Sequence, residues 1–172
     1  NEFLPLLREL IRIDDAVEAP SQKPRAPYDA LHWEQTGMRH HPDYYRRLCG
    51  SLACAAFGGS FVANWPRNQF APMNRWYGLM NRLASKPPRL LQWDSWRFWE
   101  SMACGCATFH VDLERYGARL PEMPVNWRHY IGVDLENMRS SVERIGDEPG
   151  VLEQVGREGR EWALEHYGPT AV

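Results

Sequence analysis

The chain has 172 residues, of which 44% are hydrophobic and 24% charged, and its 20 Lys and Arg residues nearly balance 22 Asp and Glu residues for a net charge of −2. This composition argues against disordered, collagen-like and coiled-coil chains, and the charge balance argues against binding to nucleic acid phosphates. Since there is no apolar run of about 18 residues and no signal-peptide layout, we expect a cytoplasmic protein without a membrane span.

Residues 1–41 are predicted to hold one helix and a proline-rich linker. Apolar residues recur at helical spacing from Glu2 to Ile13, and a Pro-rich run from Pro20 to Pro27 follows. Because the chain starts without Met and ends at Val172 with no helix-ending signal, we expect it to be part of a longer polypeptide that includes a preceding domain.

Residues 42–172 are predicted to form one domain. A short helix at 43–49 is opened by Pro42, and the small apolar run 51–57, ended by Gly58 and Gly59, is typical of a buried parallel strand. The segment 64–88 is predicted to hold a helix within an extended connection. A strand at 89–92, a helix at 96–104 stopped by Gly105, and a strand at 107–111 together predict a βαβ unit.

The last third of the chain continues the alternation of strands and helices. A short strand at 130–133 precedes Asp134, which is predicted to cap a helix at 135–145, and an amphipathic helix is predicted at 151–166. We therefore predict an α/β fold, with a Rossmann-like, mainly parallel sheet flanked by helices.

The most informative segment is residues 92–106, where a strand leads through a polar turn into a helix. Such a turn places backbone N–H groups and a helix N-terminus at the carboxyl edge of a parallel sheet, where α/β folds bind ligands. Arg97 and Glu100 are three residues apart, so both can project from one helix face, the cation toward a phosphate and the carboxylate toward sugar hydroxyls.

The run from Glu100 through Ala103 and Gly105 to His110 resembles the C-terminal domain of group 1 glycosyltransferases of GT-B fold, in the branch of spore-maturation glycosyltransferase-like proteins. In that family a first Glu is followed by seven residues and then by a second Glu, whose helix runs on into Ala-Met-Ala-x-Gly and a strand. The resemblance extends over about residues 42–172.

The resemblance implies transfer of a sugar from a nucleoside diphosphate sugar to an acceptor, with no metal or other cofactor. Glu100 would hold the donor ribose, Arg97 the leaving diphosphate, and Ser95 with Gln92 the sugar or phosphate; Gln92 and Arg97 are thus the expected catalytic residues. Gln92 lacks the negative charge of the family's first Glu. The alternatives are a non-catalytic nucleotide-sugar-binding domain and a protein-interaction domain that keeps a decayed site.

Several residues have both a functional and a structural interpretation. Trp93, Trp96 and Trp99 are spaced as a core-facing helix stripe, although Trp93 is the most suitable to contact a base or sugar. Gly58 and Gly59 are equally consistent with a phosphate-facing loop and with a simple turn.

The polar residues near the predicted strands also leave alternatives. His110 and Asp112 end a predicted strand and could act as an acid/base pair, although an aspartate that caps the next segment is more common at a strand end. The proline-rich loop 120–130 either lines the donor pocket or is a rigid connection.

The histidines and cysteines do not predict a metal site. His32, His40, His41, Cys49 and Cys54 match no zinc spacing, and the two histidines before Pro42 are predicted to be surface or capping residues. The four cysteines, which also include Cys104 and Cys106, are predicted to be small buried thiols that serve packing in a reducing compartment.

Overall fold

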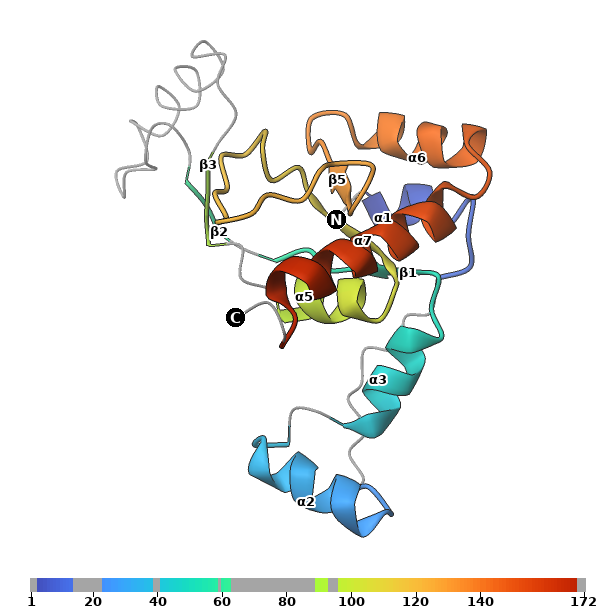
Figure 1. The fold of residues 1–172 in the computed structure, drawn as a ribbon. Helices are drawn as coiled ribbons and strands as arrows, with labels where there is room; N and C mark the ends of the chain where they lie inside the picture. Colours follow the sequence, from blue (N-terminus) through green and yellow to red (C-terminus); the bar gives the residue numbers. More distant parts are fainter. Residues whose placement is uncertain are drawn as a thin grey trace, which may run out of the picture.

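The structure is a computed structural model that describes residues 3–13, 23–38, 41–58, 60–62, 89–92 and 96–169, with only the backbone described in 60–62 and 89–92. A small parallel sheet forms its centre, with helices packed around it and α2 and α3 projecting from this body (Figure 1). Within these residues, no helix combines the length and the apolar content that crossing a bilayer demands.

The central sheet has three strands in the order β1 (Ala53–Ala55), β4 (Ala107–Val111) and β5 (Ile131–Val133), and both pairings are parallel. Each of these strands falls within or on a segment predicted from the sequence. The α/β class with a small open parallel sheet flanked by helices is therefore confirmed, and it is consistent with a Rossmann-like arrangement.

The predicted βαβ unit is wrong in one respect. β3 (Arg89–Gln92) forms at the predicted residues, but it pairs in antiparallel fashion with β2 (Ser60–Val62) in a separate two-stranded sheet. The reason is that β4 has β1 on one side and β5 on the other, so both of its hydrogen-bonding edges are already used. The helix predicted within 64–88 lies outside the described residues.

The helices follow the predicted order with differences at their ends. They are α1 (Phe3–Leu7), α2 (Pro27–Gln35), α3 (Pro42–Cys49), α5 (Trp96–Ala103), α6 (Met138–Asp147) and α7 (Val151–Tyr167). α1 is much shorter than the predicted helix at 2–13. α2 was not predicted, although Pro27 at its first position is a common way to start a helix. Gly105, at φ 84°, ends the α5 segment as predicted.

The prediction that Asp134 caps α6 is wrong. Its carboxylate instead accepts hydrogen bonds from the Glu136 backbone N–H at 3.0 Å and from the Tyr116 hydroxyl at 3.2 Å, and it pairs with Arg115 at 3.1 Å. These contacts hold a turn after β5. The helix therefore begins at Met138, three residues later than the predicted start at residue 135.

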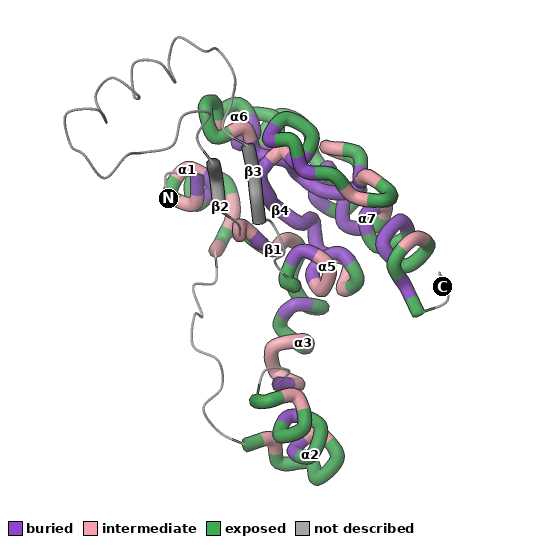
Figure 2. The backbone as a smooth tube through the Cα atoms, turned by 90° about the vertical axis from the view of Figure 1, so that its left-hand side faces the viewer, coloured by how far each residue is buried: buried purple, intermediate pink, exposed green. Residues whose placement is uncertain are grey.

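The core is centred on β4, whose five residues are all buried. Phe109 packs against Phe3 of α1 with 5.4 Å between ring centroids, whereas the alternate residues Thr108 and His110 contact Ser101 and Phe98 of α5. α1 and α5 therefore cover opposite faces of this strand. Figure 2 shows buried residues concentrated in the sheet and α7, while α2 and α3 are largely exposed or half-buried.

α7 packs against β4 and α5 through two glycines. A Cβ at Gly156 would lie 2.3 Å from the carbonyl oxygen of Gly105, and one at Gly159 would lie 2.2 Å from that of His129. The missing side chains thus allow direct contact between the α7 backbone and the loops that lead into β4 and β5.

Candidate functional site

The carboxylate of Glu100 is the centre of a polar contact between α3 and α5. The Tyr44 hydroxyl donates to one carboxylate oxygen of Glu100 at 2.9 Å, and the Tyr45 hydroxyl donates to the other at 3.0 Å. Glu100 is only half-buried, and the three side chains come from adjacent turns of two helices. The residue predicted to bind ribose is therefore an oriented hydroxyl acceptor.

The surroundings of Tyr44 and Tyr45 raise the pKa of both phenols. Burial and then the hydrogen bond to Glu100 raise the pKa of Tyr45 to about 12, and the same two causes raise the pKa of Tyr44 further. Both phenols therefore stay protonated, and remain hydrogen-bond donors to the carboxylate, throughout the neutral range.

Arg97 lies in the first turn of α5, with its side chain exposed. Burial raises the pKa of Cys54 in β1, and the positive charge of Arg97 partly offsets that rise; the same charge opposes the rise at Tyr44. Arg97 and Glu100 thus act electrostatically on the same two side chains, Tyr44 and Cys54.

The tyrosines were missed by the sequence analysis. They lie 56 and 55 residues from Glu100 along the chain, and no spacing connects them with it. The available signal was the pair of adjacent tyrosines in the first half of a helix opened by Pro42, next in the chain to the first strand of the sheet.

The remaining predicted donor residues are only partly described. Gln92 is the last residue of β3, and its backbone pairs with Ser60, but its side chain lies outside the described part. Trp93, Ser95 and Gly59 also lie outside the described residues. Gly58 follows the carboxyl end of β1.

The tryptophans of α5 differ in their environment. Trp99 stacks on Trp162 of α7 with ring centroids 6.1 Å apart and contacts Tyr167 at 4.4 Å, so it belongs to the core side, as the helical spacing predicted. Trp96 is 75% exposed, so the prediction of a core stripe is wrong for this residue. The fully buried aromatic residue of this helix is Phe98.

His110 and Asp112 do not form an acid/base pair at an open edge. The His110 side chain is completely buried, with its ring 5.2 Å from that of Phe98. Asp112 accepts hydrogen bonds from the Arg115 backbone N–H and from the Asn126 side-chain amide, both at 3.1 Å. The capping role of Asp112 is therefore confirmed, and His110 is a core residue.

The loop 120–130 is held in place by hydrogen bonds and by one cation–π contact. Asn126 donates to Asp112 and accepts from the Gly132 backbone N–H at 2.7 Å, while the His129 ring accepts from the Val125 backbone N–H at 3.1 Å. Trp127, with φ at 62°, lies under the guanidinium of Arg144, which is 4.2 Å from the ring centroid. These contacts hold the loop against the sheet and α6.

The histidine at the start of α3 has the capping role that was predicted. The ring of His41 accepts a hydrogen bond from the Asp43 backbone N–H at 3.1 Å. Across the described ranges, no group of three or more His, Cys, Asp or Glu side chains could hold a metal ion.

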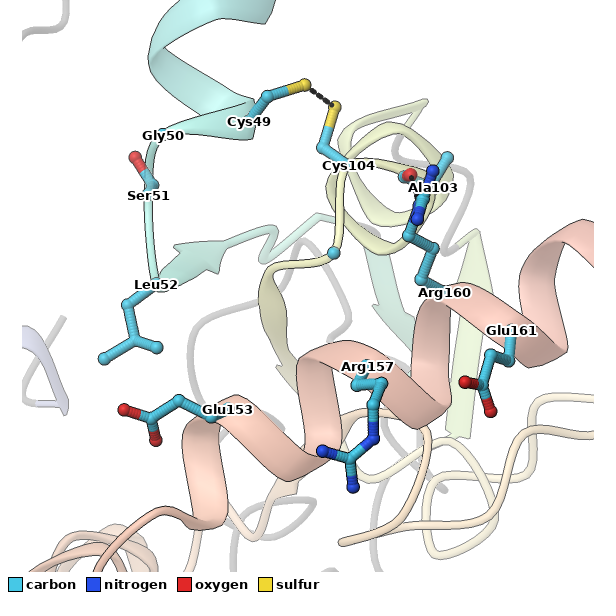
Figure 3. Close-up of a pocket in the computed structure, with 11 residues that line it drawn as sticks. Cys49, Gly50, Ser51, Leu52, Ala103, Cys104, Glu153, Arg157, Arg160 and Glu161 are labelled. Carbon is cyan, nitrogen blue, oxygen red and sulfur yellow. Dashed lines mark hydrogen bonds between the residues drawn. The ribbon is translucent and has the colours of Figure 1, made fainter.

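The cysteines differ from the prediction. Cys106 is fully buried, but Cys49 is exposed and Cys104 only half-buried. Their sulfur atoms, Sγ of Cys49 and Sγ of Cys104, are 2.9 Å apart at the edge of an open pocket of about 760 Å³ (Figure 3). Packing alone therefore does not describe these two residues.

No family model, curated protein or solved structure matches this chain in comparisons with known proteins.

Proposed function

We propose that this chain binds a nucleoside diphosphate sugar beside α5, as the donor-binding half of a group 1, GT-B-type glycosyltransferase. In this proposal Glu100 accepts hydrogen bonds from the ribose hydroxyls and Arg97 neutralises the diphosphate, while Gln92 and Ser95 contact the sugar or phosphate. The acceptor would be bound by another domain. Free thiols at all four cysteines support a cytoplasmic location for this activity.

The proposal is based on the two hydrogen bonds that the Glu100 carboxylate accepts. Each of its carboxylate oxygens accepts one hydroxyl hydrogen, from Tyr44 and Tyr45. A ribose offers the same pair of donors from its two adjacent hydroxyls, so it can replace the phenols without a change in the chemistry of the carboxylate. The exposed cation of Arg97, one turn before Glu100, supplies the charge that a diphosphate requires.

Catalysis in this proposal depends on charge and position. As the bond between the sugar and the diphosphate breaks, negative charge grows on the leaving phosphate, and Arg97 together with the N-terminus of α5 stabilises it. Gln92 can orient the sugar by hydrogen bonding. Because it carries no charge, it supplies no electrostatic stabilisation to the positive sugar carbon.

A thermal-shift screen of UDP, GDP, ADP and their common sugars tests the proposal. We expect one nucleotide to raise the melting temperature in a saturable way, by an amount equivalent to about 2.7 kcal/mol at 100 times its Kd. Glu100→Gln should abolish this shift, whereas Glu161→Gln, an exposed glutamate of α7, should preserve it. A shift that survives in Glu100→Gln, or the absence of any shift, would contradict the proposal.

A second candidate is an interaction domain, and the exposure of Trp96 favours it. This side chain is 75% exposed beside Arg97, and large apolar side chains on a surface are common in protein contacts. No response to any nucleotide, combined with a loss of self-association or partner binding in Trp96→Ala, would favour this function over donor binding.

A further inference from the structure

α3 and α5 contact each other at two levels that are one helical turn apart. Tyr45 and Cys49 are four residues apart on α3, and Glu100 and Cys104 are four residues apart along the α5 segment. The Cys104 backbone N–H donates to the Glu100 carbonyl at 3.0 Å, so the helical turn continues to Cys104. The Tyr45 hydroxyl is 3.0 Å from the Glu100 carboxylate, and Sγ of Cys49 is 2.9 Å from Sγ of Cys104.

The contact between Cys49 and Cys104 is a pair of free thiols that a small molecule can reach. Cys49 is exposed, and both sulfur atoms point toward each other at the rim of the open pocket between α3, α5 and α7 (Figure 3). A disulfide needs an S–S distance of about 2.05 Å. The two sulfur atoms therefore have to approach by less than 1 Å from the 2.9 Å observed.

We propose that Cys49 and Cys104 form a redox site at which a small-molecule disulfide, such as glutathione disulfide, introduces an intramolecular bond that clamps α3 onto α5. This site is independent of the proposed donor binding, because it requires only the two thiols and an oxidant. Its effect reaches Glu100, since the contact of Glu100 with Tyr45 is the next turn along the same pair of helices.

The reaction takes two steps of thiol–disulfide exchange. The Cys49 thiolate attacks one sulfur of the small disulfide, the S–S bond of the reagent breaks, and one small thiolate leaves from a mixed disulfide. Cys104 then loses its proton to solvent and attacks Sγ of Cys49, which releases the second small thiolate. Two protein thiols are oxidised, the reagent is reduced to two thiols, and the two protons pass to those products.

The environment assigns the two cysteines different roles. Burial, followed by the hydrogen bond with Cys49, raises the pKa of Cys104 to about 12, so Cys104 is a poor first nucleophile. Cys49 is exposed and is the sulfur that a reagent in the pocket meets first. Cys104 therefore resolves the mixed disulfide, aided by its position directly beside Cys49.

The other two cysteines are not suited to this reaction. Cys106 is fully buried, its thiol donates to the Leu48 carbonyl at 3.0 Å, and burial raises its pKa to about 12. Cys54 lies within β1 and is half-buried, and burial raises its pKa as well. Cys54 consequently provides a control position on the same chain.

The test is to treat the full chain with glutathione disulfide and map its peptides by mass spectrometry without reduction. We expect a peptide pair linked through Cys49 and Cys104, the loss of two titratable thiols, and amide hydrogen exchange across residues 42–49 that is slower by about tenfold or more, because opening of α3 is restricted. Cys54→Ser should behave like the parent chain. Cys49→Ser and Cys104→Ser should lose both the linked peptide and the slower exchange.

Three outcomes would overturn the proposal. They are glutathione adducts without a Cys49–Cys104 link, a link that involves Cys54 or Cys106, and a Cys49–Cys104 link that leaves exchange in α3 unchanged. None of these depends on a nucleotide, so failure of the redox site is distinguishable from failure of the donor-binding proposal.

Discussion

α7 and α3 pack against the same body of the protein in different ways. α7 buries seven residues along its length and brings its backbone against neighbouring loops at Gly156 and Gly159. α3 buries only Leu48, and its contacts with α5 include the two tyrosine hydroxyls on Glu100 and the thiol pair. One helix is held by shape and apolar burial, and the other by a few polar groups.

This difference has consequences for function. Water or a ligand can replace a hydroxyl–carboxylate hydrogen bond at little net cost, whereas nothing replaces a close-packed apolar contact. We therefore expect that α3 can leave Glu100 while the sheet, α5 and α7 stay folded. We infer that Glu100 is covered by a part of the molecule that is weakly attached.

The largest expected effect is the removal of a buried aromatic side chain from α5. Phe98 is 0% exposed and contacts His110 and Tyr130, so Phe98→Ala should lower the free energy of unfolding by about 3–5 kcal/mol. Urea denaturation measures this change. Trp96→Ala, at the exposed position two residues earlier, should remain within about 0.5 kcal/mol of the parent chain.

A methyl group in the close contact of α7 should have the next largest effect. Gly159→Ala places a Cβ 2.2 Å from a backbone oxygen that cannot move away cheaply, and we expect a loss of about 1–3 kcal/mol or more. The control is Gly146→Ala in α6, where the nearest atoms are side-chain carbons of Leu10 at 3.6 Å. That variant should be neutral or more stable by up to about 1 kcal/mol. Equal effects at the two glycines would show that α7 is not closely packed.

Removing the phenol hydroxyls should affect stability less and ligand access more. Tyr44→Phe and Tyr45→Phe each lose one hydrogen bond to a charged, half-buried acceptor, at a cost of about 1–2 kcal/mol or less. If the proposed donor site is correct, the double variant should bind the nucleotide more tightly, since no internal donor then competes for Glu100. Weaker nucleotide binding would instead assign the tyrosines to the ligand site itself.

The smallest effect is a pH dependence at the alkaline end. The pKa of Tyr45 is about 12 in the folded chain against 10.0 for an unperturbed tyrosine. The unfolded chain therefore loses this proton first, and stability that is fully present below pH 10 falls as the pH rises from 10 toward 12. Chemical denaturation at several pH values should show a shallower fall for Tyr45→Phe, and an identical profile would contradict the assignment.

The part of the fold that the sequence predicts best is the part with strong local patterns. The strands at 89–92 and 107–111 were placed at their observed residues, and Gly105 was identified as the stop after α5. These segments show apolar runs and a glycine that ends a helix, and both signals depend only on neighbouring residues in the sequence. The partner of β3 was wrong, because pairing depends on which strand edges the rest of the sheet leaves available.

The sequence relates some residues of the candidate site to one another but not others. The spacing of Arg97 and Glu100 placed them on one side of α5, since helix geometry relates residues three positions apart. The tyrosines and the thiol partner of Cys104 could not be found in this way. They come from α3, more than 50 residues earlier in the chain, and the packing of α3 on α5 leaves no periodic signal in the sequence.

Amide hydrogen exchange can test whether α3 leaves Glu100 while the rest of the domain stays folded. In the reduced, unliganded chain, one experiment compares α3 (Pro42–Cys49) with α7 (Val151–Tyr167). We expect α3 to exchange through a local opening that is insensitive to low urea, and the slowest amides of α7 to exchange only through global unfolding. Equal protection of the two helices, with the same dependence on urea, would show that α3 opens only when the whole domain unfolds and would contradict the claim that Glu100 has a releasable cover.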